Sequence, residues 1–134
     1  MLREYLEEKK KIVEDSLIEL LENYRGKYPE KLAEAMEYAV MNGGKRIRPI
    51  LMYMICDLFE KNNYKSYDKI KEIAAALEFI HCYSLVHDDL PAMDNDDYRR
   101  GKLTVHKKYN EAIGVLVGDV LLTETFGIIA NSKS

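Results

Sequence analysis

The sequence predicts an all-α fold on three observations. Apolar residues recur at intervals of three, four and seven positions through most of the 134 residues, as they do along one face of a helix. Glycine and proline stand between these stripes, where helices commonly end or begin. No segment alternates apolar and polar residues in the manner of a half-buried strand. We therefore expect residues 1–134 to form a single helical unit.

Two amphipathic helices are expected first. The apolar stripe of the first helix contains Leu6, Val13, Leu17, Leu20, Leu21 and Tyr24. Gly26 and Pro29 then end it. The second stripe lies within residues 32–40, and the sequence NGG at 42–44 closes it, since glycine is common just after a helix.

A third, apolar helix is expected from Pro49 to about Phe59, because a proline in the first turn gives up no helical hydrogen bond. The polar segment 61–66 predicts a connector, and Ser66 is the expected cap of a fourth helix that runs to about His87. The expected buried positions of that helix are Ile70, Ile73, Ala74, Leu77, Ile80 and Leu85. Pro91 ends or bends it.

The last expected helix covers residues 111–131, with Asn110 as its cap. It is apolar on nearly every side, which is typical of a helix inside a large core or a membrane. Asp119, Thr123 and Glu124 at its middle favour the core, so we expect no stable membrane insertion. A central helix needs neighbours on both sides, and the sequence stops a few residues later. We therefore expect an incomplete bundle.

The composition limits the partners and the location. A formal net charge of -3 argues against nucleic acid as the main partner, because a surface that follows phosphates carries a basic excess. Cys56 and Cys82 are the two cysteines, too few for a disulfide scaffold, and the first residues lack the apolar core of a signal peptide. The expected location is the cytoplasm.

An aspartate-rich segment, HDDLPAMDNDDYRRG at 87–101, follows the fourth expected helix. Asp88, Asp89 and Asp94 carry the hard oxygen ligands that suit Mg²⁺, which usually binds one or two carboxylates together with substrate phosphates. The first two of these aspartates end an apolar helix, so we expect them to face a cavity. Arg99 and Arg100 come next, and arginine binds phosphate oxygens in a bidentate manner. The combination predicts a diphosphate site.

A second anion site is expected at GGKRIRP, residues 43–49. Its glycines free the backbone, and Lys45, Arg46 and Arg48 lie at a helix start, where amide N–H groups favour an anion. His81 lies seven residues before Asp88 and therefore on nearly the same face of the fourth helix. The sequence thus predicts two diphosphate sites close together.

These motifs and GVLVGDVLLTETF at 114–126 stand in the order and spacing of the polyprenyl synthetase family. From about residue 35 to residue 131 the chain resembles the N-terminal half of a trans-isoprenyl diphosphate synthase. The resemblance implies an incomplete antiparallel or orthogonal helical bundle of the isoprenoid synthase type, and a homodimer. The family's second aspartate-rich motif, which belongs to its C-terminal half, is not in this sequence.

The resemblance also implies the roles of individual residues. Asp88 and Asp94 would bind Mg²⁺, Arg99 would bind the allylic diphosphate, and the catalytic set would be Asp88, Asp89, Asp94 and Arg99. Isopentenyl diphosphate would bind Lys45, Arg48, His81 and Arg100. The implied reaction joins isopentenyl diphosphate to dimethylallyl or geranyl diphosphate by Mg²⁺-assisted ionisation, condensation and elimination.

Product length depends on the residues just before the aspartates. A bulky Tyr83 beside the small Ser84, with two extra residues inside Asp88–Asp94, resembles the farnesyl-producing bacterial type. A geranylgeranyl diphosphate synthase, a class I terpene cyclase and a non-catalytic binding subunit derived from a synthase remain alternatives. The GGKRIRP segment weighs against the cyclase, which needs no isopentenyl site.

Overall fold

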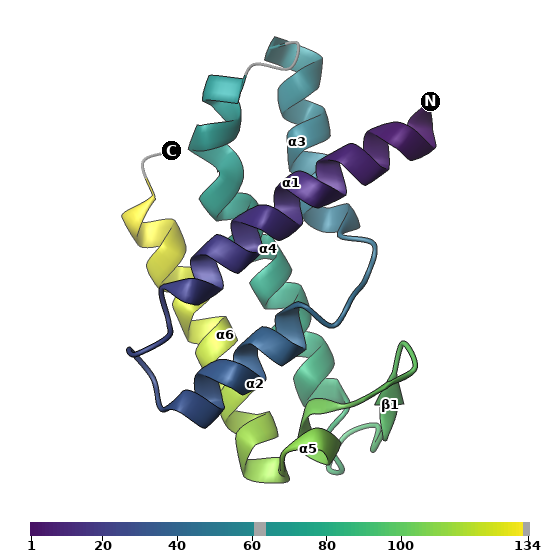
Figure 1. Cartoon of the computed structure of the whole chain (residues 1–134), viewed down its shortest axis with the longest axis vertical. Coiled ribbons are helices and arrows are strands. Elements are labelled where there is room, and N and C mark those ends of the chain that lie inside the picture. The colour runs from purple at the N-terminus through teal and green to yellow at the C-terminus, as the bar shows by residue number, and fades with distance from the viewer. Residues whose placement is uncertain (61–63, 133–134) are drawn as a thin grey trace.

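The computed structural model describes residues 1–60 and 64–132, and these form helices with one short hairpin (Figure 1). The helices are α1 (Leu2–Glu22), α2 (Glu30–Val40), α3 (Ile47–Glu60), α4 (Tyr64–Asp88), α5 (Val105–Lys108) and α6 (Glu111–Asn131). α4 and α6 pack along each other near the long axis of the molecule, and α1 and α2 cross them obliquely. The all-α prediction is confirmed.

α1 and α2 form where their apolar stripes predict them. Val13, Leu17 and Leu21 of α1 are buried, and so are Met36 and Val40 of α2. These side chains face the common core, where burial of each contributes about 1.5–3 kcal/mol relative to exposure. The loop that follows α2 runs beside α4, where Gly44 and Lys45 line one pocket with His81.

α3 begins two residues earlier than the sequence predicts. The N–H of Ile50 donates to the carbonyl of Arg46 at 3.0 Å, so Ile47 is already helical and Pro49 is the third residue of the helix. The first N–H groups of a helix have no partner within it, so proline is tolerated there as well as at the first position. Arg48 therefore lies in the first turn of α3.

α4 differs from its prediction at its start and on its faces. Ser66 lies inside the helix and is buried, so it is not the cap, and residues 61–63 of the predicted connector lie outside the described residues. Of the six positions predicted to be buried, Ala74 is buried, Ile70, Ile73 and Leu85 are half-buried, and Leu77 and Ile80 are each 37% exposed. The covered face instead carries Phe79, Cys82 and Val86. α4 is apolar on two faces, and periodicity alone does not say which one its neighbours cover.

The hairpin was not predicted, because strands of only two residues each are too short to show an alternation of apolar and polar residues. β1 (Tyr98–Arg99) pairs antiparallel with β2 (Lys102–Leu103). Arg100 and Gly101 form the turn with φ of 52° and 76°, the left-handed conformation that two-residue hairpin loops require. The hydroxyl of Thr104 donates to the carbonyl of Asp96 at 2.9 Å and ties the hairpin to the preceding loop.

α6 starts at its predicted cap, since Asn110 Oδ1 accepts the N–H of Ile113 at 2.8 Å. One face packs against α4 and is buried at Gly114, Val117, Gly118, Leu121 and Thr125. The adjoining face exposes Val115, Phe126 and Ile129. Neighbours were expected on both sides, and in the described residues this face has none. By length and hydropathy alone, α6 is long and apolar enough to cross a membrane, with a mean hydropathy of 1.8.

Candidate functional site

The four residues predicted for one anion site come together in the structure. Lys45, Arg48, His81 and Arg100 line one pocket of about 570 Å³, which we call the basic pocket. Its other lining residues are Lys10, Gly44, Arg46, Ile47 and Glu78. In the described part of the chain, Lys45, Arg48 and Arg100 have no ion-pair partner. An anion entering this pocket would therefore meet cations that are not already neutralised.

Arg100 reaches the basic pocket because two glycines make room for it. The hairpin turn carries Arg100 over the loop at 43–44, and a Cβ atom on Gly44 would lie 3.1 Å from its guanidinium carbon. The φ of Gly44 is also positive, at 115°, where a side chain would strain the backbone. The glycine pair thus has a spatial reason beyond the local turn: it lets the hairpin approach the start of α3.

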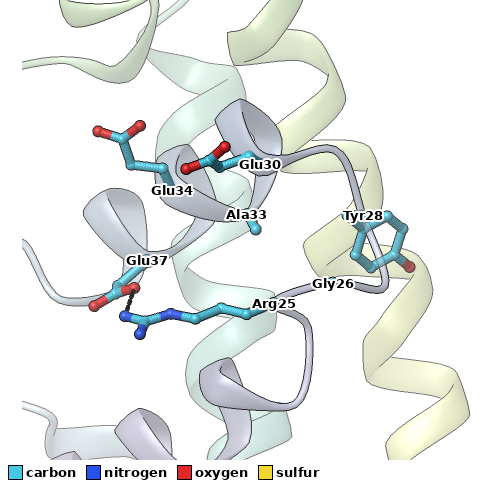
Figure 2. Close-up of a pocket in the computed structure, with 7 residues that line it drawn as sticks. All are labelled: Arg25, Gly26, Tyr28, Glu30, Ala33, Glu34 and Glu37. Carbon is cyan, nitrogen blue, oxygen red and sulfur yellow. Dashed lines mark hydrogen bonds and ion pairs between the residues drawn. The ribbon is translucent and has the colours of Figure 1, made fainter.

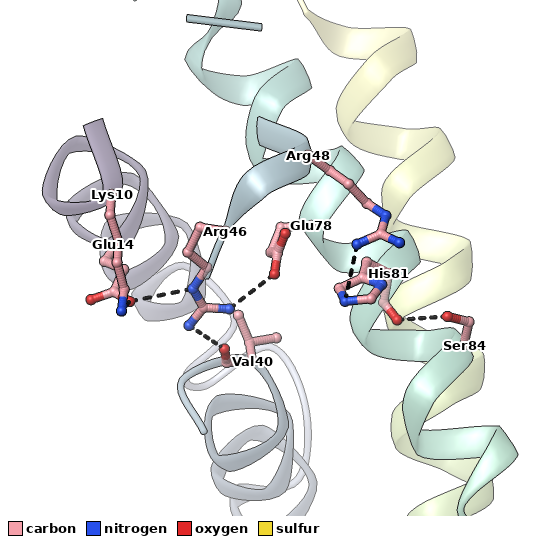
Figure 3. Close-up of polar contacts among 8 residues, drawn as sticks. All are labelled: Lys10, Glu14, Val40, Arg46, Arg48, Glu78, His81 and Ser84. Atoms are coloured by element: carbon pink, nitrogen blue, oxygen red, sulfur yellow. Dashed lines mark hydrogen bonds and ion pairs between the residues drawn. The ribbon is translucent and has the colours of Figure 1, made fainter. Parts of the chain in front are cut away.

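Arg46 has a structural role and does not offer its charge to the basic pocket. It is 3% exposed, and its guanidinium donates to Glu14 at 3.3 Å, to Glu78 at 3.1 Å and to the carbonyl of Val40 at 2.7 Å (Figure 3). Buried ions persist when they are paired and hydrogen-bonded in this way. Arg46 therefore joins the start of α3 to α1, α2 and α4.

His81 is held as a neutral base inside the basic pocket. Nη1 of Arg48 lies 3.4 Å from Nε2 of His81 (Figure 3), and because arginine can only donate, Nε2 must accept. Burial lowers the pKa of His81, the charges of Arg48, Arg100 and Arg99 lower it further, and Glu78 opposes them. The positive charge of the pocket therefore comes from lysine and arginine.

The aspartates at the end of α4 separate into an exposed pair and a buried member. The chain folds back after α4, and the N–H of Asp94 donates to the carbonyl of Asp88 at 2.8 Å. This bond holds the two residues next to each other, and both are exposed. Asp89 is 4% exposed, and Nε and Nη2 of Arg99 donate to its two oxygens at 2.9 and 2.8 Å.

The pair of Asp89 and Arg99 fixes the hairpin to the end of α4. The hydrogen bond to Asp89 raises the pKa of Arg99, so this arginine stays charged. Arg99 and Arg100, adjacent in sequence, therefore have different partners: Arg99 bonds to Asp89, and Arg100 lines the basic pocket. The expectation that both first aspartates face a cavity holds for Asp89, which lines a small cavity of about 20 Å³, while Asp88 is exposed.

The two residues predicted to control product length lie on different sides of α4. Ser84 is four residues before Asp88 and so lies on nearly the same face as Asp88 and as the exposed Leu77 and Ile80. The ring of Tyr83 instead packs edge-on against His87 at 5.4 Å. Nε2 of His87 lies 2.9 Å from the carbonyl of Val115 on α6. Tyr83 is therefore directed toward the side of α4 that packs on α6.

A second pocket, of about 590 Å³, lies beside the loop between α1 and α2 (Figure 2). It is lined by Arg25, Gly26, Tyr28, Glu30, Ala33, Glu34 and Glu37. Arg25 is paired with Glu37 at 2.6 Å, so the remaining charge is that of the other two glutamates. This pocket repels anions, and none of the residues predicted for the diphosphate sites lines it.

The comparisons with known proteins agree with this geometry. Residues 29–134 match the polyprenyl synthetase family. The chain belongs to this family. A farnesyl diphosphate synthase from Micrococcus luteus is 47% identical over 96% of this chain and 44% of its own length. A geranylgeranyl diphosphate synthase from Cyanophora paradoxa is likewise 47% identical, over 94% of this chain and 40% of its own length.

The fold is also similar to that of solved family members. The crystal structure of a geranyltranstransferase from Thermotoga maritima superposes with a TM-score of 0.80 at 40% identity, over 93% of this chain and 44% of that one. The isoprenoid synthase type of bundle is thereby confirmed. This polyprenyl synthetase chain spans less than half the length of the relatives it matches.

Sequence reasoning missed three residues in or beside the basic pocket. Lys10 lines the basic pocket from α1, Glu78 lines it from α4, and Glu14 helps to hold Arg46. Glu78 could have been identified from the sequence, since an acidic residue on the buried face of an apolar helix needs a cationic partner. Lys10 could not have been identified, because nothing in the sequence distinguishes it from the other lysines of the charged N-terminal helix. Only the fold places it at the basic pocket.

Proposed function

We propose that this chain binds isopentenyl diphosphate and one side of the allylic substrate in a short-chain trans-prenyltransferase that makes farnesyl diphosphate. The observation that carries the proposal is the meeting of Lys45, Arg48 and Arg100 in the basic pocket, next to the loop that holds Asp88 beside Asp94. A pocket of this size with three cations from two separate segments suits a compact, highly charged anion such as a diphosphate.

The exposed pair of Asp88 and Asp94 fits Mg²⁺. Both are hard oxygen donors, and Mg²⁺ usually takes one or two carboxylates and completes its shell with phosphates and water. Within residues 1–60 and 64–132, no cluster of three or more metal-binding side chains forms. Substrate phosphates and water would complete the shell of an ion held by this pair. When bound, Mg²⁺ would neutralise the charge that develops on a departing diphosphate.

The proposed reaction needs no side-chain nucleophile. The bond between the allylic carbon and its diphosphate oxygen breaks, the double bond of isopentenyl diphosphate attacks that carbon, and the released diphosphate takes the proton. Arg99 uses Nε and Nη2 for Asp89, so we assign its Nη1 to the allylic diphosphate. The arginines act by stabilising the leaving group electrostatically.

Product length and assembly are further parts of the proposal. Dimethylallyl and geranyl diphosphate are the proposed allylic substrates, and Tyr83 is the proposed limit to the tail. A geranylgeranyl diphosphate synthase is the second candidate, because a relative of that name matches as well as the farnesyl diphosphate synthase does. The exposed apolar face of α6 at Val115, Phe126 and Ile129 supports the proposed homodimer.

Calorimetry can test the two sites separately. Titration of isopentenyl diphosphate in EDTA measures the affinity of the basic pocket. Titration of a non-hydrolysable thiolo analogue of dimethylallyl diphosphate in the presence of Mg²⁺ measures the affinity of the allylic site. We expect Lys45→Ala to weaken the first and spare the second, and Asp94→Asn to do the reverse. A single substitution that abolished both would contradict the division into two sites.

A further inference from the structure

A lysine outside the family match borders the basic pocket. Lys10 lies on α1, before residues 29–134 that match the family. It lines the basic pocket together with Lys45 and Arg48. Lys10 and Lys45 also line the adjoining apolar pocket of about 500 Å³ between α1 and the start of α3, so both lie at the border between the two pockets.

Lys10 forms only a weak ion pair. Its ammonium lies 4.0 Å from Oε1 of Glu14, the limit for an ion pair, and its side chain is 41% exposed. The same oxygen accepts a shorter bond of 3.3 Å from Nε of Arg46, and Arg46 is buried (Figure 3). Glu14 is thus engaged mainly by Arg46, whereas Lys10 has a long, flexible stem that can carry its ammonium elsewhere.

We propose that Lys10 is an additional phosphate-binding residue, which contacts the diphosphate held by Lys45, Arg48 and Arg100. This inference rests on the proposed function of the basic pocket. α1 thereby contributes to the site, and an incoming diphosphate draws the ammonium of Lys10 from Glu14 toward its oxygens. The interaction is charge-assisted and partly shielded from water, conditions under which a hydrogen bond is stronger than at an open surface.

The chain offers a matched control for this lysine. Lys11 is the next residue, carries the same charge, pairs with Asp15 at 3.0 Å and does not line the basic pocket. Lys10→Gln and Lys11→Gln change the net charge equally. A difference in anion binding between them therefore measures position and not overall electrostatics. Circular dichroism checks that both variants fold.

The test is calorimetric titration of inorganic pyrophosphate and of isopentenyl diphosphate into the 134-residue chain in EDTA. We expect Lys10→Gln to weaken the binding of both ligands about tenfold, a change of about 1.4 kcal/mol in binding free energy. Lys11→Gln should weaken their binding less than twofold. Lys10→Arg should keep most of the affinity. With ¹³C-dimethylated lysines, the Lys10 methyl resonance should shift on addition of pyrophosphate while that of Lys11 stays in place.

Equal affinities of the Lys10→Gln and Lys11→Gln variants, with a clear loss for Lys45→Ala, would overturn the inference about Lys10 and leave the basic pocket intact. An unmodified chain that bound neither anion, or a Lys45→Ala variant that bound both normally, would overturn the proposed function, and the role of Lys10 with it.

Discussion

Lys9 is 1% exposed, and its charge is balanced by a carboxylate on another helix. Its ammonium on α1 lies 3.4 Å from Asp57 on α3. Tyr5 and Tyr67 donate hydroxyl hydrogen bonds to the same carboxylate. Burial alone would raise the pKa of Asp57, but these bonds and the charge of Lys9 outweigh burial and lower it. The cluster joins α1, α3 and α4, and none of its four residues lines the basic pocket.

Asp57→Asn should destabilise the chain by about 2 kcal/mol at neutral pH, because it removes the charge of the buried carboxylate that Lys9 and the two hydroxyls share and leaves the ammonium with the exposed Glu8 at 3.5 Å. A lowered pKa means that the carboxylate stabilises the fold above its unfolded pKa of about 3.9 and loses this effect as pH falls further. The deficit of the variant should therefore shrink below about pH 4. Urea unfolding followed by circular dichroism measures both. Asp15→Asn, at an exposed ion pair, is the control, and an equal loss there would contradict the argument.

Tyr83 and Ser84 make competing predictions about product length. In a synthase completed with the C-terminal half of the Micrococcus luteus relative, Tyr83→Ala should give products longer than fifteen carbons if Tyr83 limits the tail. Ser84 lies nearer the face of Asp88, so Ser84→Phe should shorten the products. Chromatography of the dephosphorylated products measures both. Unchanged products with Tyr83→Ala and shorter ones with Ser84→Phe would move the limit to Ser84.

A glycine on α6 makes room for a side chain of α4 where the two helices pack together. A Cβ atom on Gly118 would lie 2.0 Å from Nε2 of His87. Gly118→Ala should push the ring out of its bond to the carbonyl of Val115 and destabilise the fold by about 1–3 kcal/mol. Gly127 lies on the same helix, and a Cβ there would meet Glu124 at 3.8 Å, an ordinary contact. Gly127→Ala should stabilise by up to about 1 kcal/mol through helix propensity. Urea midpoints that moved the same way in both variants would argue against this contact.

A substitution of Gly44 tests whether this glycine makes room for the side chain of Arg100 in the basic pocket. Gly44→Ala should weaken pyrophosphate binding, because the new methyl group would displace the guanidinium from the basic pocket. Gly26→Ala is matched to it, since Gly26 also has a positive φ, 83°, but a Cβ there meets nothing within 4 Å. Both variants should lose stability through backbone strain. Calorimetry should show the loss of affinity in the Gly44 variant alone.

Helices with long, regular apolar patterns could be predicted from the sequence. The short hairpin, and the buried face of a helix that is apolar on two sides, could not. Asn110 was identifiable as a cap because it directly precedes a long apolar segment. The hairpin depends on Arg100 and Gly101 in a two-residue turn, which alternation over longer segments does not detect. Leu77 and Ile80 were assigned to the wrong face because both faces of α4 are apolar. The resemblance to the polyprenyl synthetase family grouped Lys45, Arg48, His81 and Arg100 in one site, but not Lys10, which only the fold brings there.

At the scale of the molecule, two helices present apolar faces to solvent. On α3, Leu51, Ile55 and Leu58 are exposed at 49%, 57% and 76%. On α6, Phe126 is 64% exposed. Exposed apolar faces of this extent mark surfaces that associate with other protein. The α6 face supports the proposed homodimer, which leaves the α3 face as the candidate for contact with the part of the relatives' fold that this chain does not span.

We expect the 134-residue chain alone to bind a hydrophobic dye and to show little or no turnover with isopentenyl and dimethylallyl diphosphate. The reason is that its described residues supply one basic pocket and one exposed pair of carboxylates, with no cluster of three or more metal-binding side chains. Co-expression with the separate C-terminal half of the Micrococcus luteus relative should cover the exposed face of α3, lower dye fluorescence and restore product. Leu51→Glu together with Ile55→Glu on α3 should block this assembly without weakening pyrophosphate binding. Robust product from the purified chain alone would show that the basic pocket and the aspartate pair suffice for catalysis.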